Sequence, residues 1–381
     1  MAHIALNALP VYTESSFRNA GVSRFSSQLI DAVLAADHEH RYSVFLNDSV
    51  GMPLFCARPN VTIRRTRLPT SRTWLRILWE HCVAPVHVAT SDIDVVHSFL
   101  NVTPLAAPAR HVVIVHDLSF LRVPETHPAR RRWYLYAATR LSTHRASAVL
   151  ADSCATRDDL IKYFGTKPHK VSVVYPGVAP EFRPRPPSEI HAFCADKGIR
   201  QPFILSVGTI EPRKNVDVIV RAFARLQRER RYTGSLVIIG GQGWMGVDLP
   251  DVIRSAQVTK HAQWLGYVKQ EELPFWYSAA DLLVYPSSYE GFGLPVLEAM
   301  ASGTPVITSN RSSLPEVVGD AGLTVEPRDE AALANAMDKV LQSSGRRDAM
   351  RARGLARAQQ FTWDSAADSC LDAYRSVLTR A

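Results

Sequence analysis

Two glutamates eight positions apart, Glu290 and Glu298, are the residues of this chain best suited to chemistry on a small ligand. They enclose the string "EGFGLPVLE", where Gly291 and Gly293 let a ligand approach the backbone and Pro295 suits the first turn of a helix. The amides and dipole at a helix start favour an anion such as a diphosphate. An ionised carboxylate accepts hydrogen bonds from hydroxyl pairs, so each glutamate suits a neutral, hydroxylated part of the same ligand.

A nucleotide sugar has this layout, because a diphosphate lies between a ribose diol and the hydroxyls of a sugar. We therefore predict that Glu298 binds the ribose and Glu290 the sugar. The amides of Gly293 and Leu294 are predicted to bind the phosphates. The alternative for Glu298 is a carboxylate near a helix start that the helix dipole merely stabilises.

Two stretches carry a family resemblance: "SSYEGFGLPVLEAMASGTPVI" at 287–307 and "SVGTIEPRKNVDVIVRAF" at 206–223. They resemble the diagnostic stretches of the retaining group 1 glycosyltransferases with the GT-B fold. In that family the first glutamate approaches the donor sugar and the second the nucleotide ribose. The donor-binding residues that the resemblance implies are Gly21, Gly208, Thr209, Arg213, Lys214, Tyr267, Val268, Glu290, Gly291, Phe292, Gly293, Leu294 and Glu298.

The segment "GTIEPRKN" places Arg213 and Lys214 between a predicted strand and a helix that Asn215 is predicted to cap. Two cations at the end of a strand can bind a diphosphate and stabilise it as a leaving group. A solvated basic pair is the alternative, and the resemblance favours the diphosphate role, in which both cations act in catalysis together with Glu290.

Two residues of the N-terminal half are candidates for the same site. His116 ends the strand in "VIVHDLSF", and the resemblance implies that it contacts the donor sugar, with Asp117 as the partner that orients its ring. Gly21 begins a helix, so its amide is predicted to approach the diphosphate. The family often has two glycines where this chain has Ala20 and Gly21, and a simple helix-entry residue is the alternative.

Strand-like runs alternate with helical periods, which is typical of parallel sheets with crossover helices. With the resemblance, this predicts an α/β fold of two doubly wound Rossmann-like domains that face each other across a cleft, the GT-B fold. The predicted strands are 3–9, 42–48, 95–99, 111–117 and 147–153 in the first half and 203–210, 235–241, 263–268, 281–287 and 304–309 in the second.

The proline-rich segment at 175–189 is the predicted linker between the domains. Residues 1–180 are predicted to form an acceptor-side domain and 181–360 a domain that binds the nucleotide sugar. The last segment, 361–381, is predicted to be a helix that crosses back to the N-terminal domain, as in the resembling fold.

Charge and motifs exclude several other classes of protein. The net charge is +8, and residues 1–180 hold 20 Lys and Arg against 13 Asp and Glu, an excess too modest to predict a nucleic-acid binder without a recognition motif. The first strand is not followed by the GxGxxG of a dinucleotide-dependent oxidoreductase. A nucleotide-sugar epimerase, or a non-catalytic nucleotide-sugar-binding protein of the same architecture, remains an alternative.

Neither a metal nor a cofactor is predicted besides the nucleotide sugar, which is a co-substrate. The five cysteines form no CxxC pair, and no DxD-type pair or His/Cys cluster indicates a metal site, so Arg213, Lys214 and helix amides are predicted to replace a divalent ion. The resemblance implies retention of configuration. The residue sequence "GTIEPRKN", by its resemblance alone, favours mannose from GDP-mannose as the transferred hexose.

The acceptor and the location are inferred from hydropathy and from one basic segment. No run approaches the ~20 apolar residues of a membrane span and the start lacks signal-peptide features, which predicts a cytoplasmic protein. Residues 63–83 combine five arginines with Trp74 and Trp79, a composition suited to an anionic membrane surface, with Arg130–Arg132 beside it. Such docking predicts a lipid-linked glycan acceptor of surface polysaccharide or lipopolysaccharide assembly. A half-buried helix is the alternative.

Overall fold

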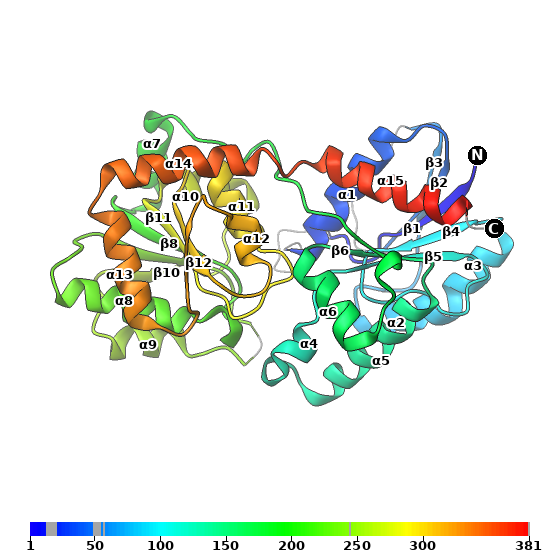
Figure 1. Ribbon diagram of the computed structural model, residues 1–381, viewed down its shortest axis with the longest axis horizontal. Helices are drawn as coiled ribbons and strands as arrows, with labels where there is room; N and C mark the ends of the chain where they lie inside the picture. Colours follow the sequence, from blue (N-terminus) through cyan, green and yellow to red (C-terminus); the bar gives the residue numbers. More distant parts are fainter. Residues whose placement is uncertain (13–20, 49–54, 56–57, 244, 380–381) are drawn as a thin grey trace. The chain divides into compact units, whose positions relative to one another are not determined.

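The computed structural model describes residues 1–12, 21–48, 55, 58–243 and 245–379. The chain forms two compact units (Figure 1). Unit 1 comprises Met1–Leu121, Pro128–Gly177 and Thr362–Ala381, and unit 2 comprises Arg122–His127 and Val178–Phe361. Each unit is built around one parallel sheet with helices against it, which is the predicted fold class.

In the described part of the chain, the sheet of unit 1 has seven strands in the order β3-β2-β1-β4-β5-β6-β7, all paired in parallel. The strands are β1 (His3–Asn7), β2 (Arg41–Leu46), β3 (Val61–Arg65), β4 (Val95–Ser98), β5 (Arg110–Val115), β6 (Ala148–Ala151) and β7 (Val171–Val173). The five predicted strands are present. The sequence missed β3, an edge strand whose residues are half-buried or exposed, and β7, which has three residues.

The helices of unit 1 include the last one in the chain. They are α1 (Val22–Ala36), α2 (Thr73–Leu78), the π-helix η2 (Trp79–Val83), α3 (Ala84–Thr90), α4 (Ser119–Arg122), α5 (Ala129–Arg145), α6 (Cys154–Phe164), the short η4 (Pro168–Lys170) and α15 (Trp363–Thr379). α15 packs on α1, and Ala366, Cys370 and Tyr374 at i+4 steps are buried in the core of unit 1. The Tyr374 hydroxyl lies 2.5 Å from His97 Nδ1, so α15 also makes a buried polar contact with β4.

Unit 2 has six strands in its described residues, again parallel, in the order β10-β9-β8-β11-β12-β13. They are β8 (Phe203–Val207), β9 (Ser235–Ile239), β10 (Ala262–Trp264), β11 (Leu282–Tyr285), β12 (Val306–Ser309) and β13 (Leu323–Val325). Five were predicted, and β13 was missed because a strand of three residues, of which only Val325 is buried, gives little periodicity.

The helices of unit 2 cover this sheet. They are η3 (Pro124–Thr126), α7 (Pro187–Lys197), η5 (Pro212–Lys214), α8 (Val216–Arg228), α9 (Leu249–Ser255), η6 (Gln270–Glu272), α10 (Leu273–Ala279), α11 (Leu294–Ala301), α12 (Leu314–Val318), α13 (Glu330–Leu341) and α14 (Ser344–Ala358). The helix predicted to follow "GTIEPRKN" is α8, and its apolar face is buried at Val216, Ile219, Val220, Phe223 and Leu226.

Strand order determines which loops of unit 2 become neighbours. β8 pairs with β9 on one side and with β11 on the other, so the direction of the chain across the sheet reverses between β8 and β11. Ligands of open α/β sheets bind at the carboxyl ends of the strands at such a reversal. The loops that leave β8 and β11 carry the two stretches with the family resemblance.

Candidate active site

Glu290 lies at the centre of a buried cluster of charges in unit 2. Its side chain follows β11 and is 7% exposed. One carboxylate oxygen, Oε2, lies 2.8 Å from Arg213 Nη1, and the other, Oε1, lies 2.5 Å from Lys214 Nζ. The Tyr285 hydroxyl donates to Oε1 at 3.0 Å. The sequence predicted that the glutamate and the two cations bind different parts of a ligand, and the structure brings them together.

The cations hold Glu290 in its ionised form. Burial would raise the pKa of Glu290, but Arg213 and Lys214 lower it to about 2. Burial lowers the pKa of Lys214, and Glu290 opposes that change. The result is a fixed arrangement of charges held by two ion pairs, and fixed charges limit the reorganisation that a reaction requires.

The turn after β8 fixes the position of the two cations. Arg213 Nε donates to Glu211 at 2.9 Å, and Arg213 Nη1 donates to the Tyr289 carbonyl at 2.9 Å. Asn215 occupies the N-cap position of α8 with φ 52°, but its side chain makes no capping hydrogen bond, contrary to the prediction. The Asn215 side chain instead donates to the Pro286 carbonyl at 2.8 Å, because the β11 loop is adjacent in the sheet.

Serines that the sequence analysis did not single out hold the glycine loop. Ser313 Oγ donates to the carbonyls of Phe292 at 2.7 Å and Glu290 at 3.1 Å, and Ser312 Oγ donates to the Glu290 carbonyl at 2.5 Å. Gly293 has φ 110°, and a Cβ there would lie 2.7 Å from a methyl of Leu314. Glycine is therefore required at the start of α11 for packing as well as for backbone geometry.

Glu298 lies in α11 and is 3% exposed. Its Oε2 accepts a hydrogen bond from the Tyr277 hydroxyl at 2.9 Å. Tyr277 belongs to α10, so the second glutamate of the motif is held by a neighbouring helix, whereas the first is held by cations from a neighbouring loop.

The other donor-binding candidates of unit 2 lie in loops that follow strands. Gly208 and Thr209 follow β8, and a Cβ at Gly208 would lie 3.6 Å from Lys214 Cε, so this glycine adjoins the charge cluster. Tyr267, which is 42% exposed, and half-buried Val268 follow β10. Gly291 and Phe292 belong to the glycine loop, and Leu294 is the first residue of α11.

His116 lies in unit 1, one residue after β5, and is 9% exposed. Asp152 orients its ring: His116 Nδ1 lies 2.7 Å from Asp152 Oδ2. The predicted partner, Asp117, accepts a hydrogen bond from the Ser119 amide at 2.9 Å instead. The assignment was wrong because the adjacent strand β6 ends beside β5, so the nearest carboxylate comes from residue 152 rather than from the next residue in the chain.

Both ring nitrogens of His116 face oxygen acceptors, since Nε2 lies 2.9 Å from the Phe99 carbonyl. Both nitrogens can donate only in the imidazolium form. Burial lowers the pKa of His116, but the Asp152 carboxylate outweighs burial and the net pKa is raised. The geometry therefore favours a charged His116, which is suited to electrostatic stabilisation and not to the role of a general base.

Gly21 precedes α1 with φ 43° and ψ −98°, and it is exposed. A Cβ at Gly21 would meet no atom within 4 Å, so backbone conformation and not crowding explains the glycine. The predicted polar loop before it, with Ala20, lies outside the described residues. In the ranges that the structure describes, no three His, Cys, Asp or Glu residues are arranged to hold a metal ion.

Comparison with known proteins places these residues in a family. Residues 193–357 match the family described as glycosyl transferases group 1, and residues 20–182 match glycosyltransferase family 4. The O-antigen chain mannosyltransferase B of Escherichia coli is 37% identical over 267 residues, which are 70% of this chain and 70% of that protein. The chain belongs to the group 1 glycosyltransferases. It is an enzyme of this retaining family and, by homology, a hexosyltransferase.

Other similar proteins have a lower sequence identity to this chain. The D-inositol 3-phosphate glycosyltransferase of Frankia alni is 33% identical over 62% of this chain and 60% of its own length. Sucrose-phosphate synthase from Thermosynechococcus elongatus superposes with a TM-score of 0.79 at 21% identity over 100% of both chains. WaaG, a glycosyltransferase involved in lipopolysaccharide biosynthesis, gives 0.75 at 20% identity over 100% of both chains. These likenesses confirm the GT-B fold.

Proposed function

We propose that this glycosyltransferase moves mannose from GDP-mannose to a hydroxyl of a glycan or lipid-linked acceptor in surface polysaccharide assembly. The observation that carries the proposal is the Glu290 cluster, in which Arg213 and Lys214 hold a carboxylate beside a helix start at the carboxyl edge of unit 2. The relative named O-antigen chain mannosyltransferase B supports mannose as the sugar.

In the proposed reaction, Arg213, Lys214 and the amides of Gly293 and Leu294 bind the diphosphate and stabilise the charge that develops as it leaves. Glu290 accepts hydrogen bonds from sugar hydroxyls, and Glu298 accepts them from the ribose. The acceptor hydroxyl attacks from the face that the phosphate leaves, and that phosphate takes the proton. His116 supplies a positive charge near the sugar, and Gly21 an amide near the diphosphate.

The remaining donor contacts are assigned by position. Gly208 and Thr209 adjoin the diphosphate, and Tyr267 and Val268 meet the base. Unit 2, corresponding to predicted residues 181–360, is the nucleotide-sugar side. Unit 1, corresponding to 1–180 with 361–381, is the acceptor side.

Calorimetric titration with GDP, UDP, ADP and dTDP and their sugars tests the donor. We expect GDP and GDP-mannose to bind most tightly, and Glu290→Gln to keep GDP affinity while lowering kcat. Tighter binding of another nucleotide would replace GDP-mannose as donor, and a variant with normal kcat would remove Glu290 from the reaction. Activity is expected to survive EDTA, so strict dependence on Mg²⁺ or Mn²⁺ would contradict the metal-free assignment.

We further propose that the enzyme acts in the cytoplasm and docks on the anionic inner face of the membrane through the basic segment 63–83. No described helix of the chain is long and apolar enough to span a bilayer. The segment forms β3, α2 and η2, in which Trp79 is buried, so only part of it can meet lipid. Trp74 is 62% exposed, and Trp133, beside Arg130–Arg132, is 72% exposed.

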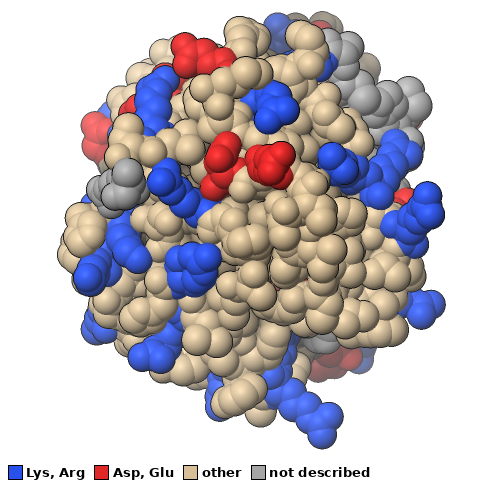
Figure 2. Space-filling model, turned by 90° about the vertical axis from the view of Figure 1, so that its right-hand side faces the viewer, with Lys and Arg blue, Asp and Glu red and all other residues tan. Residues whose placement is uncertain are grey.

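Charge on this side of unit 1 is scattered. Figure 2 shows the side of unit 1 that carries β3, α3 and α15 in Figure 1. On this side, Lys and Arg side chains outnumber those of Asp and Glu, but uncharged surface separates them. Such a surface gives weak attraction that sums over several cations, at about 1 kcal/mol each near an anionic leaflet.

Vesicle sedimentation tests the docking. Replacing exposed Arg64, Arg65, Arg67 and Arg72 by glutamine should abolish binding to vesicles rich in anionic lipid and leave donor affinity intact. Half-buried Arg76 is left unchanged in this variant, because its Nε lies 4.0 Å from Oε1 of buried Glu80. The matched control replaces four exposed arginines of unit 2 by glutamine: Arg221, Arg228, Arg230 and Arg254. Equal binding to neutral and anionic vesicles would contradict the proposal and favour a soluble acceptor.

A further inference from the structure

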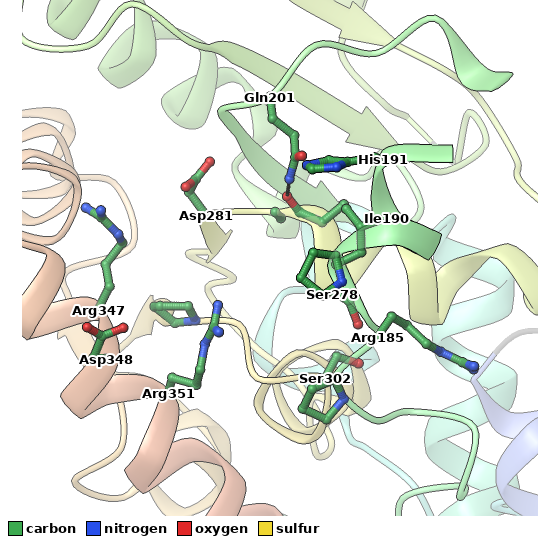
Figure 3. A pocket seen from close by; sticks show the side chains of 15 residues that line it. Arg185, Ile190, His191, Gln201, Ser278, Asp281, Ser302, Arg347, Asp348 and Arg351 are labelled. Atoms are coloured by element: carbon green, nitrogen blue, oxygen red, sulfur yellow. Dashed lines mark hydrogen bonds between the residues drawn. The ribbon is translucent and has the colours of Figure 1, made fainter. Parts of the chain in front are cut away.

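A hollow of about 260 Å³ lies at the amino edge of the sheet in unit 2 (Figure 3). Gln201 and Asp281, which precede β8 and β11, line it, and so does Pro305, which precedes β12. The Glu290 cluster follows the opposite ends of β8 and β11. The hollow, which we call the amino-edge pocket, is therefore separate from the candidate active site. Its volume suits a ligand somewhat smaller than a typical drug molecule.

Ser302 offers the pocket a buried group that lacks a partner. Its side chain is 3% exposed, and Oγ has no hydrogen-bond partner among the residues that the structure describes. Such a group is costly to leave unsatisfied, so a ligand or water that bonds to it is favoured. Asp281 lines the same pocket, where one of its oxygens accepts from the Phe203 amide at 3.0 Å. Burial raises the pKa of Asp281, and the amide of Phe203 and the charge of Arg347 oppose that change.

Three arginines line the pocket, Arg185, Arg347 and Arg351, and they outnumber its two aspartates, Asp281 and Asp348. Arg347 and Arg351 lie one turn apart on α14 and line the pocket, and Figure 3 shows both reaching from that helix. Arg347 Nη1 also donates to the Val340 carbonyl at 3.2 Å, which fixes the guanidinium group. Gly303 has φ 78°, so backbone conformation explains the glycine, and the Arg351 stem lies next to it. Paired guanidinium groups suit a phosphate.

Helix α11 connects the pocket with the donor loop. It begins after Gly293 and ends one residue before Ser302, with Glu298 between them. The residue that holds Glu298 is Tyr277, whose neighbour Ser278 also lines the pocket. A ligand in the pocket would thus contact both elements that position Glu298.

We propose that the amino-edge pocket binds a small hydroxylated phosphate ester of the hexose phosphate class, with the phosphate on Arg347 and Arg351 and a ligand hydroxyl on Ser302 and Asp281, and that its occupancy changes the affinity of the donor loop for nucleotide. The binding stands apart from the proposed transferase function, whereas the effect on nucleotide affinity rests on it. Such an effect is reciprocal, because each ligand must change the other's affinity by the same factor.

Calorimetry with glucose 6-phosphate tests the site. Arg351→Gln should weaken binding at least ~10-fold, and Ser302→Ala by a smaller factor, because a charged contact is stronger than a neutral one. Arg353→Gln, a matched change at an exposed arginine of the same helix, should leave the affinity unchanged. Ser302→Ala removes a buried hydroxyl that has no partner among the described residues, so the variant should melt at the same temperature as the wild type or at a higher one. Glucose, which lacks the phosphate, should bind at least ~10-fold more weakly.

Three results would overturn the proposal. Equal glucose 6-phosphate affinity in wild type and Arg351→Gln would remove the pocket as the site. Loss of binding in Arg213→Ala with retention in Arg351→Gln would place the ester at the donor loop instead. A nucleoside diphosphate affinity that changes less than about fivefold when the ester is bound would disprove the coupling. If no nucleoside diphosphate bound in either condition, the proposed function would fail while the result for the pocket stood.

Discussion

Each unit buries a carboxylate at the carboxyl edge of its sheet, and the pKa values of the two carboxylates are shifted in opposite directions. Glu290 in unit 2 meets two cations, Arg213 and Lys214, and its pKa falls to about 2 in spite of burial. Asp152 in unit 1 meets one imidazole, and burial outweighs His116 so that its pKa rises. Glu290 has two cations within reach, whereas Asp152 has one cationic partner and the like charge of Asp117 nearby, which raises the pKa of Asp152 further.

This difference separates two kinds of chemistry. In the cluster of unit 2, Glu290 has a pKa of about 2 and is therefore ionised over the physiological pH range. In unit 1 the pKa values of both His116 and Asp152 are raised. The ordinary pKa of a histidine lies closer to neutral pH than that of an aspartate, so His116 is the member of the pair whose charge changes nearer neutral pH.

Removing a cation from the Glu290 cluster should have the largest effect on catalytic efficiency. Lys214→Ala and Arg213→Ala should each lower kcat/KM by ~10²–10³-fold, because each removes a preformed charge that stabilises the leaving group. Steady-state kinetics with the donor identified by calorimetry measures this. Lys162→Ala, an exposed lysine of α6, is the control. Variants within threefold of wild type would show that the cluster is structural.

The pH dependence of stability should reveal the ionised state of Glu290. A pKa lowered from 4.5 to about 2 contributes about 3 kcal/mol above pH 4.5, and this is lost as pH falls from about 4.5 to about 2. The difference in unfolding free energy between wild type and Glu290→Gln should therefore narrow by about 2 kcal/mol between pH 5 and pH 3. Urea unfolding at both pH values measures it. A constant difference would contradict the lowered pKa.

The second glutamate should matter for binding. Glu298→Ala should weaken nucleoside diphosphate binding by roughly 1–3 kcal/mol through the lost ribose contact. Tyr277→Phe should have a smaller effect, because it removes only the group that orients the carboxylate. Isothermal titration measures both, with exposed Glu271→Ala as control. Unchanged affinity in Glu298→Ala would end its ribose assignment.

The smallest effect concerns His116. Asp152→Asn should lower the His116 pKa, and Asp117→Asn should lower it by less, since Asp152 is the carboxylate in contact. NMR titration of the histidine ring signals reports it. A raised His116 pKa adds stability below about pH 6.5 that is lost as pH rises through the folded value, so the advantage of wild type over Asp152→Asn should shrink on alkalinisation. Equal shifts in both variants would reject Asp152 as the orienting partner.

Local periodicity carried much of the fold prediction. Buried parallel strands are continuous apolar runs, so ten strands and the apolar face of α8 could be predicted from residue order alone. The strands β3, β7 and β13 could not, because short or partly exposed strands lack a continuous apolar run.

The sequence by itself determined which residues are candidates, since the two glutamates, the glycines and the Arg213–Lys214 pair lie in short contiguous motifs. Only the tertiary structure decided which of them meet. The reversal of strand order brings the loops after β8 and β11 together, so Lys214 contacts Glu290 across 76 positions of sequence, and β6 brings Asp152 to His116 in place of Asp117. Neighbouring strands lie ~5 Å apart whatever their separation along the chain, and for that reason partners of buried charges follow sheet topology and not sequence distance.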